Sequence, residues 1–224
     1  MKNLLMICAG LILSVALQAQ DYTKAVDADP AAKALLEKLK AKYEGYNSMA
    51  INFSLLIEFP EEPQETQKGT LLQQGNKFRL DMEAQRLISD GKSVWLYLKN
   101  NKEVQINDAE QDDSGGILSP NDLLKVYNSG EYVYALINAY EENGRLIQQI
   151  EFKPLDSYSE YSKIRLTIDK NKQEVIRIKA FSKDGSRYTL LIDSLTPNPS
   201  VPAGSFVWNK SECPDCYVED LRID

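Results

Sequence analysis

The sequence predicts an α+β protein that is mainly β, with one leading helix, ten or so short antiparallel strands and a second, short helix in the middle of the chain. Three observations predict this fold. Apolar residues recur at helical spacing in two segments only, most of the remaining chain alternates apolar and polar residues in short runs, and no linker or internal repeat divides the chain.

The chain opens with the pattern of an export signal. One lysine precedes an apolar run at residues 4–17, and the small residue Ala19 follows it, as in secretory signal peptides. The run is too short to span a bilayer comfortably, and Cys8 lacks the small residues that precede a lipid-attachment cysteine. We therefore expect residues 1–19 to be removed and residues 20–224 to form one domain that is exported to a bacterial periplasm without a lipid anchor.

Composition excludes several classes of function. The chain carries 26 Lys and Arg against 33 Asp and Glu, and loss of the signal's one lysine leaves 25 against 33, a charge of −8. An acidic protein of this kind is a poor partner for nucleic acid. Because the chain has no histidine, Ser-His-Asp and Cys-His nucleophiles and imidazole metal sites are excluded. No catalytic residue, metal or cofactor is predicted.

The N-terminal helix has both of its ends marked in the sequence. Asp29 is a suitable N-cap and Pro30 fits the first turn, while Gly45 ends the helix. Between them one face is apolar. That apolar stripe consists of Ala32, Leu35, Leu36, Leu39, Tyr43 and Tyr46.

Period-two alternation predicts the strands. They are expected near residues 51–59, 69–74, 78–83, 87–89, 94–98, 104–106, 132–139, 146–153, 163–169, 175–182 and 186–195. The short central helix is expected to start at Ser119–Asp122 and to continue to Tyr127. A last strand is expected at Phe206–Trp208, with the tail at residues 217–223 paired to it.

Two cysteines, Cys213 and Cys216, remain after removal of the signal. In an oxidising compartment this spacing favours a structural disulfide. The alternative is a redox-active Cys-x-x-Cys, which normally lies between a strand and a helix whose N-terminus lowers the thiol pKa. No helical pattern follows Cys216, so a disulfide that staples the chain is the preferred interpretation.

The two helices are too short to cover the apolar face of so many strands, so the sheet must curl into a barrel, stack on itself or leave a hollow. A curled sheet with the helices across its open end would enclose an apolar hollow. Such a hollow suits a hydrocarbon ligand, because each buried methylene contributes about 0.8 kcal/mol. For each candidate residue named below, the alternative to contact with a ligand is ordinary packing in the protein core. The sheet-side candidates for lipid contact are Phe53, Leu55, Phe78, Leu80, Met82 and Trp95, and the lid-side candidates are Leu35, Leu39, Leu123 and Tyr127. Alternation does not decide whether Trp95 or its neighbour Val94 faces inward.

Several motifs, in order along the chain, resemble the outer-membrane lipoprotein carrier protein family, the periplasmic LolA proteins. The most specific is the hairpin at Asp90–Tyr97, of the form DGK-x-x-W-x-Y. It follows a strand pair that contains Gly69–Leu71 and Phe78–Leu80. The remaining matches are the helix-to-strand junction at Tyr46–Ser54, the central helix at Leu118–Leu124, and a closing pattern of Phe206, Val218, Asp220 and Arg222.

The resemblance implies that residues 20–224 form a lipoprotein-carrier-like domain, in which a single strongly curved antiparallel sheet of about 10–11 strands makes an unclosed half-barrel. The N-terminal helix and the short central helix would act as its lid. The resemblance also implies a monomeric, non-catalytic carrier that shields the acyl chains of lipoproteins in its cavity. Its implied partners are acylated lipoproteins, an inner-membrane lipoprotein-releasing ABC transporter and an outer-membrane acceptor. Many family members have an arginine that holds the lid closed, and Gln74 stands at the matching position here. A neutral amide would bond a lid carbonyl less strongly than a guanidinium does.

Two alternatives from other classes remain. A carbohydrate-active periplasmic enzyme would need a pair of carboxylates about 5–10 Å apart in a polar cleft. A non-catalytic interaction domain would have a filled core and a large exposed apolar patch. A cavity lined by apolar side chains, with no carboxylate pair, would favour the carrier.

Overall fold

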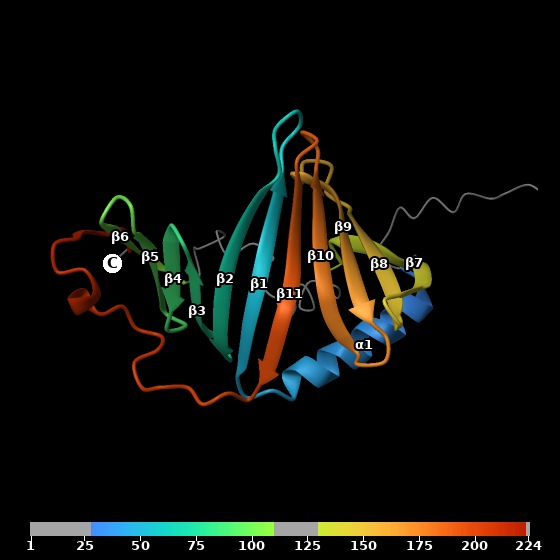
Figure 1. Cartoon of the computed structure of the whole chain (residues 1–224), viewed down its shortest axis with the longest axis horizontal. Coiled ribbons are helices and arrows are strands. Elements are labelled where there is room, and N and C mark those ends of the chain that lie inside the picture. Colours follow the sequence, from blue (N-terminus) through green and yellow to red (C-terminus); the bar gives the residue numbers. More distant parts are fainter. Residues whose placement is uncertain (1–27, 110–129, 223–224) are drawn as a thin grey trace, which may run out of the picture.

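The computed structural model describes residues 28–109 and 130–222, which form one long, unclosed, curved sheet with a helix on its concave side (Figure 1). The helix is α1 (Pro30–Glu44). The strands of the sheet, in chain order, are β1 (Met49–Glu58), β2 (Glu65–Gln74), β3 (Lys77–Met82), β4 (Gln85–Ser89), β5 (Ser93–Leu98), β6 (Glu103–Asp108), β7 (Tyr132–Glu142), β8 (Arg145–Pro154), β9 (Tyr161–Asp169), β10 (Glu174–Ser182), β11 (Arg187–Pro197) and β12 (Tyr217–Asp220).

The sheet consists of two antiparallel meanders joined edge to edge. Its spatial order is β12-β6-β5-β4-β3-β2-β1-β11-β10-β9-β8-β7. The pairing of β1 with β11 joins the first meander to the second. The short strand β12 pairs with β6 in parallel, unlike every other neighbouring pair. The predicted curved, unclosed sheet is confirmed.

The C-terminal region differs from its predicted arrangement. Residues Phe206–Trp208 form no strand, and the tail pairs with β6 instead. The ring of Trp208 packs on Tyr97, with centroids 4.8 Å apart, so this residue serves side-chain packing rather than a hydrogen-bonded ladder. The strand β2 also begins at Glu65, four residues before the predicted start of that strand at residue 69.

Helix α1 begins where the sequence predicts it to begin. The Oδ1 atom of Asp29 accepts a hydrogen bond from the backbone N–H of Ala31 at 2.8 Å, which satisfies a donor left free by the first turn. The buried face of the helix consists of Ala32, Leu36, Leu39 and Tyr43. These side chains pack on the concave face of the sheet, toward the lower ends of β8–β10 in Figure 1. In the described ranges no helix combines the length and the apolar character that crossing a membrane requires.

Irregularities in strand pairing accompany the curvature of the sheet. The register shifts between Asn52 and Phe53 where β1 meets β11. It shifts twice where β10 meets β9 and once where β7 meets β8. An extra residue in one strand bends that strand and increases the local twist. The bulges therefore help to curl the second meander toward its concave side.

The two halves of the convex face differ in character. On the half formed by β8–β10, Glu151 binds Lys163 at 3.1 Å and Arg165 at 2.8 Å, and both cations lie within about 5.5 Å of the centre of the Phe181 ring. Burial alone would raise the pKa of the Glu151 carboxyl, but hydrogen bonds from the two cations prevail and lower it. This half is therefore a polar, solvated surface.

A close approach between Phe53 and Gly69 stabilises the centre of the sheet. These residues face each other across β1 and β2. A Cβ atom at Gly69 would lie 2.3 Å from the Cζ atom of Phe53, so the aromatic ring occupies the space above the glycine. A glycine without a side chain leaves room for the ring of a cross-strand neighbour. Phe53 is consequently buried although it lies beside a cavity.

We predict that Gly69→Ala lowers the free energy of unfolding by about 1–3 kcal/mol, because overpacking costs more than the gain from removing a flexible glycine. Urea denaturation measures the change. Thr70→Ala, at the exposed neighbouring position, is the control and should have little effect. The double variant Gly69→Ala/Phe53→Leu should recover part of the loss, and a Gly69→Ala protein as stable as the control would contradict the interpretation.

Candidate functional site

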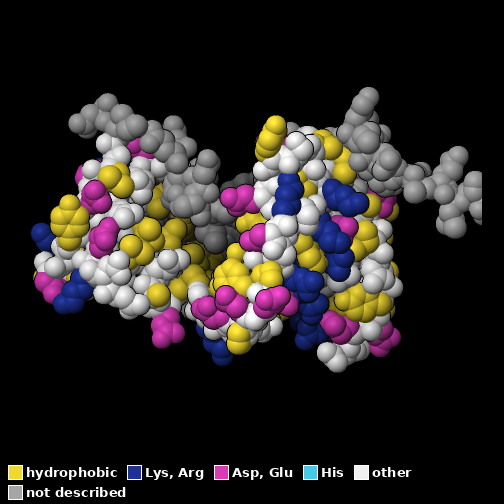
Figure 2. All heavy atoms as spheres, turned by 90° about the horizontal axis from the view of Figure 1, so that it is seen from above, with side chains coloured by type: hydrophobic (Ala, Val, Ile, Leu, Met, Phe, Trp, Pro, Cys, Tyr) yellow, Lys and Arg dark blue, Asp and Glu magenta, His cyan; other side chains and the backbone are white. Residues whose placement is uncertain are grey.

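An apolar cavity of about 200 Å3 lies on the concave side of the sheet. Seen along the strands in Figure 2, the molecule is hollowed between the β2–β6 half and the half that contains β9–β11, and hydrophobic side chains form the walls of the hollow. The cavity is lined by Phe53, Leu55, Leu80, Met82, Tyr161, Ile164, Ile178, Ala180, Tyr188 and Leu190.

The structure brings four of the predicted sheet-side residues together in this wall. Phe53 and Leu55 come from β1, and Leu80 and Met82 come from β3. Their alternation along two paired strands places them on the same face. Phe78, on the same face, packs half-buried against the core and lies outside the cavity lining.

The predicted lid-side residues of α1 form part of the core instead of the cavity wall. Leu39 is fully buried and Leu35 is partly buried, and neither lines the cavity. The other two candidates, Leu123 and Tyr127, lie outside the described residues, as does the predicted signal at 1–19. Lipid contact by any of these side chains stays a prediction.

Helix α1 is fixed to the sheet at both of its ends. At the N-terminal end, Oδ2 of Asp29 accepts a hydrogen bond from the N–H of Leu136 at 3.0 Å. At the C-terminal end, the buried hydroxyl of Tyr43 accepts one from the N–H of Val175 at 3.1 Å. Lys42 also pairs with Glu174 at 3.0 Å. These bonds tie α1 to β7 at one end and to β10 at the other, so displacing the helix requires breaking both sets.

The other six lining residues come from the second meander and were not predicted as site residues. Ile178 and Ala180 alternate on β10 with the charged residues Arg177 and Lys179. The alternation of apolar and charged residues, which predicted this strand, was the signal in the sequence that could have identified Ile178 and Ala180 as lining residues. It did not reveal that β11 pairs with β1, which is the contact that places the second meander beside Phe53.

The lining contains neither a charged side chain nor a carboxylate within the described part of the chain. The carboxylate pair that a carbohydrate-active enzyme would need is therefore absent from this wall. The polar side chains of the lining are the two tyrosines, Tyr161 and Tyr188. Burial raises the pKa of the Tyr161 phenol above its ordinary value, and the nearby Glu160 and Tyr188 raise it further.

Trp95 faces away from the cavity, which corrects the prediction that it lines the hollow. Its neighbour Val94 is buried, while the Trp95 side chain packs in a separate cluster on the convex face. That cluster contains Trp95, Tyr97, Val104, Ile106, Trp208, Cys213 and Cys216. Alternation alone left open which residue of the Val94–Trp95 pair faces inward, and the C-terminal residues that cover Trp95 decide it.

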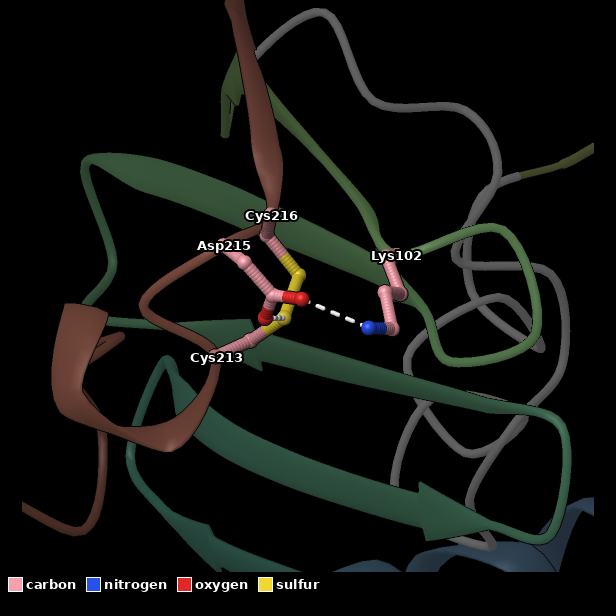
Figure 3. Close-up of a disulfide and its surroundings, with 4 residues drawn as sticks. All are labelled: Lys102, Cys213, Asp215 and Cys216. Atoms are coloured by element: carbon pink, nitrogen blue, oxygen red, sulfur yellow. Dashed lines mark hydrogen bonds and ion pairs between the residues drawn. A yellow bond between two sulfur atoms is a disulfide. The ribbon is translucent and has the colours of Figure 1, made fainter.

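The two cysteines in this cluster form the predicted disulfide, with an S–S distance of 2.08 Å. Figure 3 shows the bond beside the turn after β5, where Lys102 and Asp215 lie 2.6 Å apart. Their ion pair is exposed to solvent and screened, so it contributes little to stability. The disulfide is buried in the same cluster as Trp208 and Tyr97, so its position is that of a structural cross-link, here called the staple.

A cluster of charged side chains on the convex face also binds the C-terminal part of the chain that contains the disulfide. Arg79 binds Asp81 at 2.8 Å, and Arg86 pairs with both Asp81 and Glu212. Burial alone would raise the pKa of Asp81, but hydrogen bonds from the two arginines prevail and lower it. Glu212 comes from the C-terminal segment, residues 198–222, so this cluster fastens that segment to β3 and β4.

The sequence of residues 20–209 matches the family model "Outer membrane lipoprotein carrier protein LolA". The chain belongs to the LolA family. The match covers the whole sheet from β1 to β11 together with α1. It confirms the resemblance carried by the hairpin at Asp90–Tyr97 and its neighbours. A search of curated proteins found no match.

Several solved structures are similar to this chain at low sequence identity. An uncharacterized conserved protein from Thermus thermophilus superposes with a TM-score of 0.56 at 11% identity, with 86% of this chain and 99% of that chain covered. A putative outer membrane lipoprotein-sorting protein domain from Vibrio parahaemolyticus superposes with a TM-score of 0.46 at 15% identity, with 78% of this chain and 95% of that chain covered. Lipoprotein LppX from Mycobacterium tuberculosis superposes with a TM-score of 0.48 at 12% identity, with 78% of this chain and 99% of that chain covered.

The position that matches the lid-locking arginine of many LolA proteins lies on the outer side here. Gln74 is exposed at the end of β2, and strand alternation places it on the convex face, opposite α1. Its neighbour Gln73 occupies the concave face and is buried. The amide nitrogen of Gln73 donates to the carbonyl of Gly75 at 3.4 Å. Gln74 therefore lies on the opposite side of the sheet from α1. The predicted central helix of the lid lies outside the described residues, so the lid-locking role of Gln74 stays a prediction.

We predict that Tyr43→Phe lowers the free energy of unfolding by about 1–3 kcal/mol, because the buried N–H of Val175 loses its acceptor. Urea denaturation measures the effect. The matched control is Tyr46→Phe, on the neighbouring half-buried ring 5.7 Å away, which should change stability little. Equal stability of the two variants would contradict the anchoring role of Tyr43.

The advantage of wild type over Tyr43→Phe should shrink at high pH. Burial raises the pKa of the Tyr43 phenol above its ordinary value and prevails over the hydrogen bond to Val175, which lowers it. The unfolded chain releases this proton above about pH 10, whereas the folded chain retains it, so the stability difference is complete below that pH and is lost above it. We expect a loss of about 1.4 kcal/mol between pH 9 and pH 11, and a constant difference would contradict it.

We predict that reduction of the disulfide loosens the C-terminal segment without unfolding the sheet. The closed loop is short, with a sequence separation of three, so the lost constraint corresponds to about 2 kcal/mol. Hydrogen exchange of the β12 amides should accelerate, while exchange in β1 and β11 stays unchanged. The double variant Cys213→Ser/Cys216→Ser should behave like the reduced protein, and unchanged β12 exchange would argue against the staple.

Proposed function

We propose that this protein is an exported, non-catalytic carrier that binds the acyl chains of lipids or lipoproteins in its concave cavity. The observation that carries the proposal is an uncharged cavity of about 200 Å3 whose wall is built by five strands of the sheet's two meanders. Family membership supports the same role. Transfer of lipoproteins from an inner-membrane ABC transporter to an outer-membrane acceptor is the specific form that we propose.

The volume of the cavity limits what it holds without rearrangement. At about 30 Å3 for a group of the size of a water molecule, 200 Å3 holds about seven methylenes. At about 0.8 kcal/mol each, they contribute about 6 kcal/mol before ordering and association costs are subtracted. The cavity as it stands therefore suits part of one acyl chain bound with modest affinity, which is the regime in which a carrier releases its cargo.

Three acyl chains of a triacylated lipoprotein need more space than this. Enlargement requires α1 to move from the concave face, against the bonds of Asp29 and Tyr43 at its two ends. Acyl chains that replace the contacts of Leu36 and Leu39 would compensate for the loss. Because release restores the original contacts, the net affinity stays modest.

The direct test is the isolation of the protein from the periplasm of cells with intact lipoprotein export. Extraction with organic solvent and mass spectrometry should reveal co-purified acyl chains, and immunoblotting should reveal bound lipoproteins. A second measurement is displacement of the neutral fluorescent probe 1-aminoanthracene by C12 ligands. Protein that carries no acylated molecule and whose probe is displaced by no C12 ligand would overturn the proposal.

We predict that Ala180→Phe abolishes acyl binding while the fold is retained. Ala180 lines the cavity, so a phenyl group at this position fills space that the ligand needs without removing any core contact. Affinity for a C12 ligand should fall by at least about tenfold, equivalent to about 1.4 kcal/mol, with the urea midpoint unchanged or raised. Ala139→Phe, at an exposed position of β7, is the control, and normal binding by Ala180→Phe would place the ligand elsewhere.

A further inference from the structure

The cavity has polar atoms at one end only. Tyr161 is the first residue of β9 and Tyr188 is the second residue of β11, so both lie at the strand ends opposite α1, at the top of Figure 1. They supply the side-chain hydroxyls among the ten lining residues of the described chain. Within the described residues, no hydrogen bond engages either hydroxyl. We call these residues the tyrosine pair.

The rings of the tyrosine pair are held in place although their hydroxyls are free to bind. Phe59 packs edge-on against Tyr188, with the ring centroids 6.4 Å apart and the planes at 90°. The tips of two hairpins meet beside this contact, because a Cβ on Gly185 would lie 3.2 Å from Pro60. Tyr161 packs against the main core cluster. Donors held in this way lose little conformational entropy when they bind a ligand.

We propose that the tyrosine pair binds the carbonyl of an ester- or amide-linked acyl chain whose hydrocarbon runs down the cavity toward Phe53 and Leu80. This inference rests on the proposed function and defines how the ligand is oriented. The chain enters from the hairpin end, and the end nearer α1 receives the terminal methyl. A carbonyl oxygen accepts two hydrogen bonds, so it can satisfy both phenols at once.

The chemistry of the wall favours a neutral head group over a free fatty acid. No charged side chain lines the cavity in the described ranges. A carboxylate bound beside the tyrosine pair would lose its hydration without gaining an ion pair with a cation, and this costs free energy. Glu160 lies near enough to the phenol of Tyr161 to raise its pKa, after the larger effect of burial, and this negative charge also opposes an anionic ligand.

The experiment compares three C12 ligands of equal chain length: methyl laurate, laurate and dodecane. Each displaces 1-aminoanthracene from the purified full chain and from two variants, Tyr161→Phe and Tyr188→Phe. Wild type should bind methyl laurate about threefold to tenfold more tightly than dodecane, since a hydrogen bond contributes in this range. Each variant should lose most of this preference and should keep its affinity for dodecane.

Tyr97→Phe is the matched control, because its ring lies on the convex face beside Trp208. It should retain the preference for methyl laurate. Thermal unfolding of each variant, measured without ligand, establishes that the fold is intact. Because a Tyr→Phe change preserves the ring and its packing, loss of preference without loss of dodecane binding reports the hydroxyl alone.

The outcomes separate this inference from the proposed function. Equal binding of methyl laurate and dodecane, or a preference that survives both variants, would overturn the role of the tyrosine pair and leave the acyl carrier standing. Tighter binding of laurate than of methyl laurate would overturn the neutral head group. Failure of all three ligands to displace the probe would overturn the carrier itself.

Discussion

The constraint on which this structure depends is that a single long sheet has apolar side chains on both of its faces. A sheet can leave only a polar face open to water. The concave face is covered by α1 toward one end of the strands, and a cavity remains toward the other end. The convex face is covered only where it is apolar, by the C-terminal segment around Trp208 and the disulfide. The charged half of the convex face needs no cover.

The placement of the cavity follows from how α1 is fastened. Asp29 caps the helix and at the same time binds the backbone of β7, while Tyr43 binds the backbone of β10. The helix is thereby held across one end of the strands, and none of its residues reaches the cavity lining. The open end is the one bordered by the hairpin tips and the tyrosine pair. In the proposed mode of binding, a ligand that enters there would leave the anchors of α1 intact, whereas a larger cargo would have to break them.

Local sequence patterns predicted α1 and most of the strands, because helix capping and strand alternation depend on residues that are close together in the sequence. Asp29, Pro30 and Gly45 mark the ends of α1 because capping depends on a few adjacent positions. The strands follow from alternation, and four of the predicted sheet-side residues share the cavity wall because they alternate on β1 and β3. The proximity of Cys213 to Cys216 likewise follows from their spacing. Phe206–Trp208 was predicted wrongly, because a short alternating run does not distinguish a strand from a segment packed by its side chains.

The sequence by itself determined the elements, their two-faced character, the disulfide and the family, since each depends on residue type and near spacing. Only the tertiary structure decided which face each element presents and what covers it. Trp95 turned outward because the C-terminal segment packs on it, and Tyr161 and Tyr188 became cavity residues because β11 pairs with β1. These pairings join residues more than a hundred positions apart, and no local pattern encodes which distant strand completes an edge.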